Sequence, residues 1–322
     1  MSDNVALIII YNHQYNKNIE ILEKLYSTRF NNIYHLVPFY NGDKSNVIPV
    51  YDCSYYFQGY VAQGFKHFFK DNYVHYIFIA DDLILNPSIN QNNYAEHFKL
   101  NPATCFLPEF ITLHHRRFFW PRVSESFHYN INVAGVEAKD QIPDYDSAKR
   151  AFKYFGLEVN PLDFNQIWKA PSSIKDWARI AIKDTFYLFR RLLTKFHKKK
   201  YNLSYPLVGS YADIFVVSSD AIKQFCHYCG VFSATKLHVE IAVATAMVLT
   251  AKDINTEKEL QFQGKALWPD GFYRLNNDIN PALGDYKELE HHHYNLKNLL
   301  NNFPENYLYL HPIKLSKWNT SE

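Results

Sequence analysis

The stretch His75-Tyr-Ile-Phe-Ile-Ala-Asp81-Asp82-Leu-Ile-Leu-Asn-Pro87 decides the fold, because an apolar run of strand length ends in it on two adjacent carboxylates. The run before Asp81 predicts a buried strand. Two carboxylates at a strand end are unfavourable unless a cation lies beside them. Hard divalent cations prefer oxygen ligands, so one interpretation is a site for Mg²⁺ or Mn²⁺ and a nucleotide. The other is a helix start at which Asp caps the first turn.

The residues before this stretch alternate between strand and helix patterns. The runs are strands over 5–10, 33–39 and 47–51 and helices over 18–30 and 55–69. Continuous apolar strands alternating with helices predict an α/β fold, Rossmann-like, with a mostly parallel sheet flanked by helices on both faces.

Polar residues follow several of these strands. Tyr11 and Asn12 come after the first, Asp52 after the third, and Asp81 and Asp82 after the next. In parallel sheets ligands bind outside the carboxyl ends of the strands. We therefore expect these five residues to converge, which favours the metal interpretation of the acidic pair.

Composition excludes several classes of protein. With 47% hydrophobic and 17% aromatic residues, the chain is far from the composition of disordered proteins. Its 322 residues permit one large domain or two of ordinary size. The formal net charge of +2 gives no general attraction to nucleic acid, so we expect no nucleic-acid partner.

The apolar segments of the sequence bear on the cellular location of the protein. The first four residues precede a short apolar run without the basic region or cleavage site of a signal peptide. No apolar segment approaches the roughly 18 to 20 residues that span a bilayer. We therefore expect a cytoplasmic protein.

Cys226 and Cys229 have the spacing of half a zinc knuckle, but no second pair of Cys or His with ligand spacing follows them. They lie at i and i+3 of a predicted helix, where buried thiols of the core are the better explanation. Four cysteines in a chain of this length do not predict a disulfide framework.

The middle of the chain, residues 112–205, lacks clear strand periodicity and is interpreted as a helical insertion. Arg116 and Arg117 lie among aromatic residues there, and guanidinium groups bind planar anions such as phosphate or an acidic sugar. A solvated edge is the other interpretation of these arginines. Residues 179–200 show a basic amphipathic helical pattern, which either lies on an anionic membrane surface or packs on the core with a solvated end.

Regular patterns return after residue 205. The run 206–218 predicts a strand that contains Asp213, and 220–228 predicts a helix. Glu240 is the one acid in the apolar helical stretch 236–246. It is either a partner of the helix dipole or a general base whose pKa is raised by apolar surroundings.

The order of these motifs resembles a known family. A first strand through Asn12, an acidic strand end, the run Gly209-Ser-Tyr-Ala-Asp-Ile-Phe-Val-Val and an acid that opens a later helix follow one another. This order is similar to that of GT-A nucleotide-sugar glycosyltransferases, especially the inverting family 2 type. The resemblance implies a single GT-A-like catalytic domain over 1–322, with 112–205 inserted on the acceptor side.

The resemblance also implies roles for individual residues. Asp82 and His311, the last residue of a strand-like run, would hold Mn²⁺ or Mg²⁺, and Asp81 would contact the donor. Glu240 would be the catalytic base. Ala80 stands where the family usually has the first acid of its Asp-x-Asp motif. The nucleotide would be bound by Tyr11 through stacking, by Asn12 through hydrogen bonding and by Asp52, and other substrate contacts would come from Arg116, Arg117 and Asp213.

The expected function is metal-dependent transfer of a sugar from a nucleoside diphosphate sugar to a hydroxyl of a glycan or lipid-linked glycan. The implied chemistry is inverting, in surface polysaccharide synthesis, with residues 179–200 as a possible peripheral membrane contact. A metal-dependent nucleotidyltransferase is one alternative, but it normally needs a glycine-rich loop after the first strand, and residues 11–15 contain no Gly. A catalytically inactive scaffold that binds a sugar or nucleotide is the other.

Overall fold

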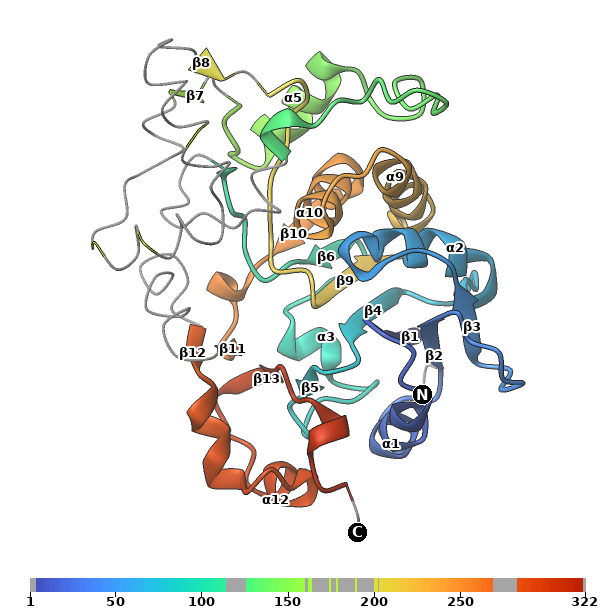
Figure 1. Ribbon diagram of the computed structural model, residues 1–322, viewed down its shortest axis with the longest axis vertical. Helices are drawn as coiled ribbons and strands as arrows, with labels where there is room; N and C mark the ends of the chain where they lie inside the picture. The colour runs from blue at the N-terminus through green and yellow to red at the C-terminus, as the bar shows by residue number, and fades with distance from the viewer. Residues whose placement is uncertain are drawn as a thin grey trace.

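The computed structural model describes residues 4–113, 126–159, 203–268 and 283–320, with isolated positions between 160 and 202. A seven-stranded sheet forms its centre (Figure 1). Four of the six neighbouring strand pairs are parallel. The α/β class and the mostly parallel sheet are therefore confirmed. In spatial order the strands are β10 (Asp253–Asn255), β6 (Thr104–Phe106), β9 (Ile214–Ser218), β4 (His75–Ala80), β1 (Val5–Ile10), β2 (Ile33–Pro38) and β3 (Val47–Val50).

Both faces of this sheet are buried, which explains why its strands are apolar without alternation. Every residue of β1 and β4 is buried. Ala6, Ile8 and Ile10 face one apolar cluster, and the residues between them face another. The first cluster is completed by α2 (Gln58–Phe68), α9 (Ile222–Ala234) and α10 (Val239–Thr250), and the second by α1 (Asn16–Tyr26) and a second sheet (Figure 1).

The second sheet has four strands and was not predicted from the sequence. Its spatial order is β12 (Leu283–Asp285), β11 (Gln263–Trp268), β13 (Tyr307–His311) and β5 (Ile84–Leu85). β13 runs antiparallel to β5, with Leu310 opposite Ile84. Because β5 follows directly after Asp82, this pairing brings the end of β13 to the acidic strand end.

Short elements complete the described chain. They are η1 (Ser54–Tyr56), α3 (Tyr94–His97), η3 (Ser126–His128), α5 (Tyr145–Tyr154), β7 (Leu162–Asp163), β8 (Lys200–Tyr201), η4 (Glu257–Glu259), η5 (Tyr286–His292), α12 (Leu296–Asn301) and η6 (Leu315–Lys317). In the described parts, each helix is too short or too polar to cross a lipid bilayer. The inserted segment 112–205 is described only in part, and the basic helix expected over 179–200 falls almost wholly outside the described residues.

One strand expected from the sequence needs correction in its bounds. The strand expected over 206–218 is formed only by Ile214–Ser218, because the residues before it make a single bridge, from Gly209 to Ile111, and then turn toward the sheet end. The direction of β9, antiparallel to both neighbours, was not predicted either.

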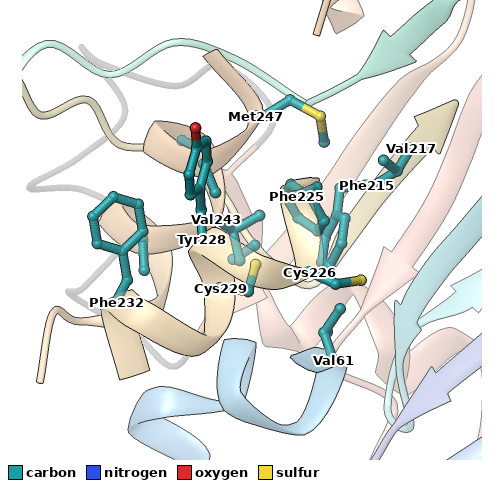
Figure 2. Packing of buried hydrophobic residues seen from close by; sticks show 14 of the residues in the cluster. Val61, Phe215, Val217, Phe225, Cys226, Tyr228, Cys229, Phe232, Val243 and Met247 are labelled. Carbon is teal, nitrogen blue, oxygen red and sulfur yellow. The ribbon is translucent and has the colours of Figure 1, made fainter. Parts of the chain in front are cut away.

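The helices above the sheet form a continuous apolar layer. Figure 2 shows Cys226 and Cys229 of α9 among apolar side chains such as Val61, Phe215 and Val243. Both thiols are buried and free, so the interpretation as core residues is confirmed. Burial raises the pKa of both thiols well above the ordinary value.

Candidate functional site

The acidic strand end is fixed by the pairing of β1 with β4. Ile10 and Ala80 are opposite one another in the parallel register, so the residues that follow them emerge side by side. The backbone N–H of Asp81 donates to the carbonyl of Ile10 at 2.8 Å. Asn12 N–H and the Asn18 amide then donate to the two oxygens of the Asp81 carboxylate at 3.3 and 3.4 Å. The first helix thus supports the acid of the fourth strand.

The antiparallel direction of β9 adds Asp213 to the same place. An antiparallel strand begins at the edge where its parallel neighbours end, so the residue before β9 lies beside the end of β4. The carbonyl of Asp213 accepts the N–H of Ala80 at 2.8 Å. Burial raises the pKa of the Asp213 carboxyl above its ordinary value.

The C-terminal segment brings two cationic side chains to Asp82. The backbone N–H of Ile313 donates to the Asp82 carbonyl at 2.6 Å, which anchors the chain after β13. His311 Nε2 lies 3.0 Å from Asp82 Oδ1 and 3.8 Å from Asp213 Oδ1. Lys314 Nζ lies 2.5 Å from Asp82 Oδ2. Each oxygen of the Asp82 carboxylate therefore faces a basic group.

The pKa values of the two neighbouring acids, Asp81 and Asp82, shift in opposite directions. Burial favours the neutral form of Asp82, but the charges of His311 and Lys314 outweigh it and hold the pKa of Asp82 well below its usual range. Burial and the negative charge of Asp82 raise the pKa of Asp81 to about 7. Burial alone would lower the pKa of His311, yet the charges of Asp82 and Asp213 raise it.

A tyrosine pair supports His311 from behind. The hydroxyl of Tyr211 is hydrogen-bonded to His311 Nδ1, and the Tyr211 ring stacks on Tyr309 with centroids 6.2 Å apart and planes 7° apart. The hydrogen bond at Nδ1 fixes the orientation of the imidazole, so that Nε2 points toward Asp82. A second hydrogen-bond partner commonly orients functional histidines in this way.

The start of α10 contributes Glu240. The side chain is 10% exposed, and its Oε2 lies 4.0 Å from His238 Nε2. His238 is the residue before the helix, and its ring lies 6.5 Å from that of Tyr55. Glu240 therefore occupies the first helical turn, where the dipole favours an anion, with the imidazole of His238 nearby.

The acidic and basic side chains described above line one cavity of about 970 Å³. Its volume falls at the upper end of the range of ligand pockets. The lining residues come from the ends of β1, β4 and β13, the segment before β9, the start of α10, and the segments near 54–57, 286–294 and 312–317. They are Asn12, His13, Tyr15, Asn18, Ser54, Tyr55, Phe57, Asp81, Asp82, Ala212, Asp213, His238, Val239, Glu240, Tyr286, Tyr294, His311, Pro312, Lys314, Leu315, Ser316 and Lys317.

Six candidates from the sequence line this cavity, namely Asn12, Asp81, Asp82, Asp213, Glu240 and His311. Tyr11 must be corrected: its ring is 0% exposed and its hydroxyl is hydrogen-bonded to His35 Nδ1 at 2.9 Å, so it has no face for a nucleobase. His13 and Tyr15, from the loop that follows, line the cavity in its place.

Asp52 lies outside the set of lining residues. Its Oδ2 accepts the hydroxyl of Ser233 at 2.6 Å, which links the end of β3 to α9. Gly59 makes room for this contact, since a Cβ there would lie 2.5 Å from Ser233 Oγ and 2.9 Å from the carboxylate. The contacts of the Asp52 carboxylate are therefore structural. Arg116 and Arg117 lie outside the described residues.

Three important residues were missed by sequence reasoning. Lys314, His238 and Tyr211 each lie two or three residues from a candidate that was identified, and no motif marks them. A basic residue soon after the predicted strand end at His311 was the available signal for Lys314. His238 and Tyr211 could be identified only from the folded structure.

The expected metal ligands can be tested against this geometry. A metal ion on Asp82 would have to displace the Lys314 ammonium, which lies on one carboxylate oxygen, and would compete with His311 for the other. Among the described residues, no three His, Cys, Asp or Glu side chains are grouped as for a metal ion. The arrangement does not fit the expected pair of ligands as it stands, and binding of Mn²⁺ or Mg²⁺ stays a prediction.

Comparison with known proteins adds no family assignment. No protein-family model matches the chain, and no curated protein sequence matches it.

Proposed function

We propose that the protein is a glycosyltransferase of the GT-A type, which moves a sugar from a nucleoside diphosphate sugar to a hydroxyl of a glycan or lipid-linked glycan with inversion. One observation carries the proposal. A single cavity holds a carboxylate–cation cluster at the strand ends and a separate carboxylate at the start of a helix. Sugar transfer needs both, because one group must stabilise the leaving diphosphate and another must take a proton.

The donor is assigned to the side of the cavity formed by β1, β4 and β13. Lys314 can donate hydrogen bonds to diphosphate oxygens there, and charge-assisted bonds of this kind are among the strong ones. Tyr15, which is 43% exposed, offers a ring for the nucleobase beside His13, whose ring lies 5.6 Å away. Asn12 offers amide hydrogen bonds.

The acceptor is assigned to the side of Glu240. The acceptor oxygen forms a bond to the anomeric carbon while the bond from that carbon to the diphosphate oxygen breaks. The hydroxyl proton passes to Glu240, and the electron pair of the broken bond stays on the diphosphate. Because attack and departure occur on opposite faces, one displacement inverts the configuration. Tyr286 and Tyr294 line the cavity and offer aromatic faces to a sugar.

Parts of the proposal concern segments outside the described residues. Arg116 and Arg117, in the insertion 112–205, are proposed to contact the acceptor or its phosphate. The basic segment 179–200 is proposed to make a peripheral contact with the cytoplasmic face of a membrane, where a lipid-linked acceptor would lie.

The proposal is tested by measuring thermal stabilisation with a panel of nucleoside diphosphate sugars, nucleoside diphosphates and free nucleosides, each with Mn²⁺ and with a chelator. A ligand that binds only the folded state at 100 times its Kd stabilises it by about 2.7 kcal/mol. We expect stabilisation by at least one diphosphate and its sugar, and none by the free nucleosides. A chain that none of them stabilises in either condition would contradict the proposal.

A second readout separates the alternatives. A transferase releases nucleoside diphosphate from the stabilising donor, whereas a nucleotidyltransferase releases pyrophosphate from a nucleoside triphosphate and a sugar phosphate. A scaffold binds the donor and releases neither product.

A further inference from the structure

We propose that Lys314 takes the place of a divalent metal ion in this chain, so that the donor diphosphate binds without metal. The inference rests on the proposed function and names the group that meets the leaving phosphate. Nucleoside diphosphates carry a concentrated negative charge, which a site neutralises either with a metal or with basic side chains. At the end of β4 the structure has a basic side chain where the sequence suggested a metal.

The position of the ammonium between protein and cavity supports this role. The Lys314 side chain is 48% exposed, whereas the Asp82 carboxylate that it contacts is 7% exposed. An ammonium group has three N–H donors. One of them is directed to Asp82 Oδ2 at 2.5 Å, which leaves the others for a ligand in the cavity that Lys314 lines. Asp82 thus acts as a positioning residue for the cation.

The backbone around Lys314 holds it in place before any ligand arrives. On one side, Ile313 N–H donates to the Asp82 carbonyl at 2.6 Å. On the other, the carbonyl of Lys314 accepts the N–H of Lys317 at 2.7 Å, and Leu315 is buried in the core. A lysine on a fixed backbone with a fixed counter-ion loses less conformational freedom on binding than a free surface lysine. The site is therefore preorganised for an anion.

The same arrangement explains the position of His311. Its Nε2 points to the other oxygen of Asp82 at 3.0 Å, so the carboxylate is held from two sides and cannot turn toward a third cation without breaking a contact. When the anomeric carbon–oxygen bond breaks, the electron pair remains on the diphosphate oxygen. Lys314 stabilises that charge by Coulomb attraction and hydrogen bonding.

The experiment measures binding of nucleoside diphosphates by calorimetry, with a chelator and then with Mn²⁺. The proteins are the wild type, Lys314→Ala, Lys314→Gln and Lys314→Arg, and melting temperatures establish that each is folded. Lys314→Gln keeps N–H donors without the charge, and Lys314→Arg keeps the charge. Lys252→Ala is the matched control, because Lys252 forms a 2.6 Å ion pair with Asp220 at an exposed site that does not line the cavity.

We expect wild-type affinity in chelator within about 3-fold of that in Mn²⁺. Lys314→Ala and Lys314→Gln should weaken binding in chelator by about 10- to 100-fold, the range for a lost charge-assisted hydrogen bond. Lys314→Arg should recover part of the loss, and Lys252→Ala should bind as the wild type does.

Other results overturn the inference. Wild-type binding that requires Mn²⁺ would leave the proposed function standing and restore Asp82 as a metal ligand. Unchanged affinity in Lys314→Ala would remove Lys314 from the site. Absence of binding by any nucleoside diphosphate in both conditions would overturn the proposed function, and this inference with it.

Discussion

The chain contains two pairs of potential ligand residues, each pair close in sequence, and the fold places the two pairs in opposite environments. Asp81 and Asp82 end β4 at the rim of a cavity and meet cationic side chains from the C-terminal segment. Cys226 and Cys229 lie on α9 and face the apolar layer between helices and sheet (Figure 2). Both pairs have a spacing that suggests ligand binding. Asp82 forms ion pairs with His311 and Lys314, whereas Cys226 and Cys229 are buried free thiols.

The difference shows that burial alone does not give a side chain a function. Burial raises the pKa of Cys226 and Cys229, which keeps them neutral and unreactive. Burial acts on Asp82 in the same direction, but opposite charges reverse the result and keep it ionised. Partners brought from more than two hundred residues away therefore decide which pair is a site.

The largest expected effect comes from placing a carboxylate in the thiol region. Cys229→Asp puts a charge into the apolar cluster that the described residues form around Cys229, so we expect a loss of about 4 kcal/mol or more in the free energy of unfolding. Chemical denaturation followed by circular dichroism measures it. Cys53→Asp is the control, because Cys53 is exposed and should change stability by less than about 0.5 kcal/mol. Equal stability of the two variants would break the comparison.

A smaller effect, of opposite sign, is expected from removing a carboxylate in the acidic region. The pKa of Asp81 is about 7 in the folded protein and 3.8 ordinarily. Below about pH 3 the acid is protonated in both states and has no effect. As the pH rises from about 3 to 7, the unfolded chain ionises first, so folding loses stability, and the full loss is present above pH 7.

Asp81→Asn removes this loss. We therefore expect the variant to be more stable than the wild type by on the order of 2 kcal/mol at pH 8, with little difference at pH 3. Urea denaturation at the two pH values measures the difference. A gain of the same size at both would show that hydrogen bonding or packing, rather than ionisation, causes it.

The smallest effect concerns Asp52, the acid that the sequence placed in the site and the fold places outside the cavity. Ser233→Ala removes the hydroxyl that donates to Asp52 at 2.6 Å. We expect a loss of about 1 kcal/mol in stability and no measurable change in nucleoside diphosphate affinity. Thermal unfolding and calorimetry on the same variant measure both. A clear drop in affinity with unchanged stability would return Asp52 to the site.

Much of the central sheet was predictable because its strands are apolar on both faces. The strand over Val5–Ile10 was located to the residue and the acidic end of β4 was located correctly, since a run that ends on Asp81 is unambiguous. The second sheet was not predictable. β5 has only two residues and β13 pairs with it across more than two hundred positions, which local periodicity cannot show.

The site was predictable where a residue stands at the end of a strand or the start of a helix, as Asp82 and Glu240 do. Whether a residue after a strand faces the cavity or the core was not predictable from the sequence. Tyr11 is the example, because it directly follows a strand but its side chain is buried in the apolar core. Lys314 was missed because its meaning depends on a contact with Asp82 that only the folded chain contains.

The central claim, that this cavity transfers a sugar with Glu240 as base, is tested by the turnover of Glu240→Gln with the donor that stabilises the wild type. Gln keeps the size and hydrogen bonding of the side chain but cannot accept the proton. We expect donor affinity and melting temperature close to wild type and a kcat lower by about 10² to 10⁴. Glu20→Gln is the control, because Glu20 is another carboxylate, paired with Lys44 at 3.3 Å at an exposed site, that does not line the cavity. Full turnover by Glu240→Gln would contradict the account.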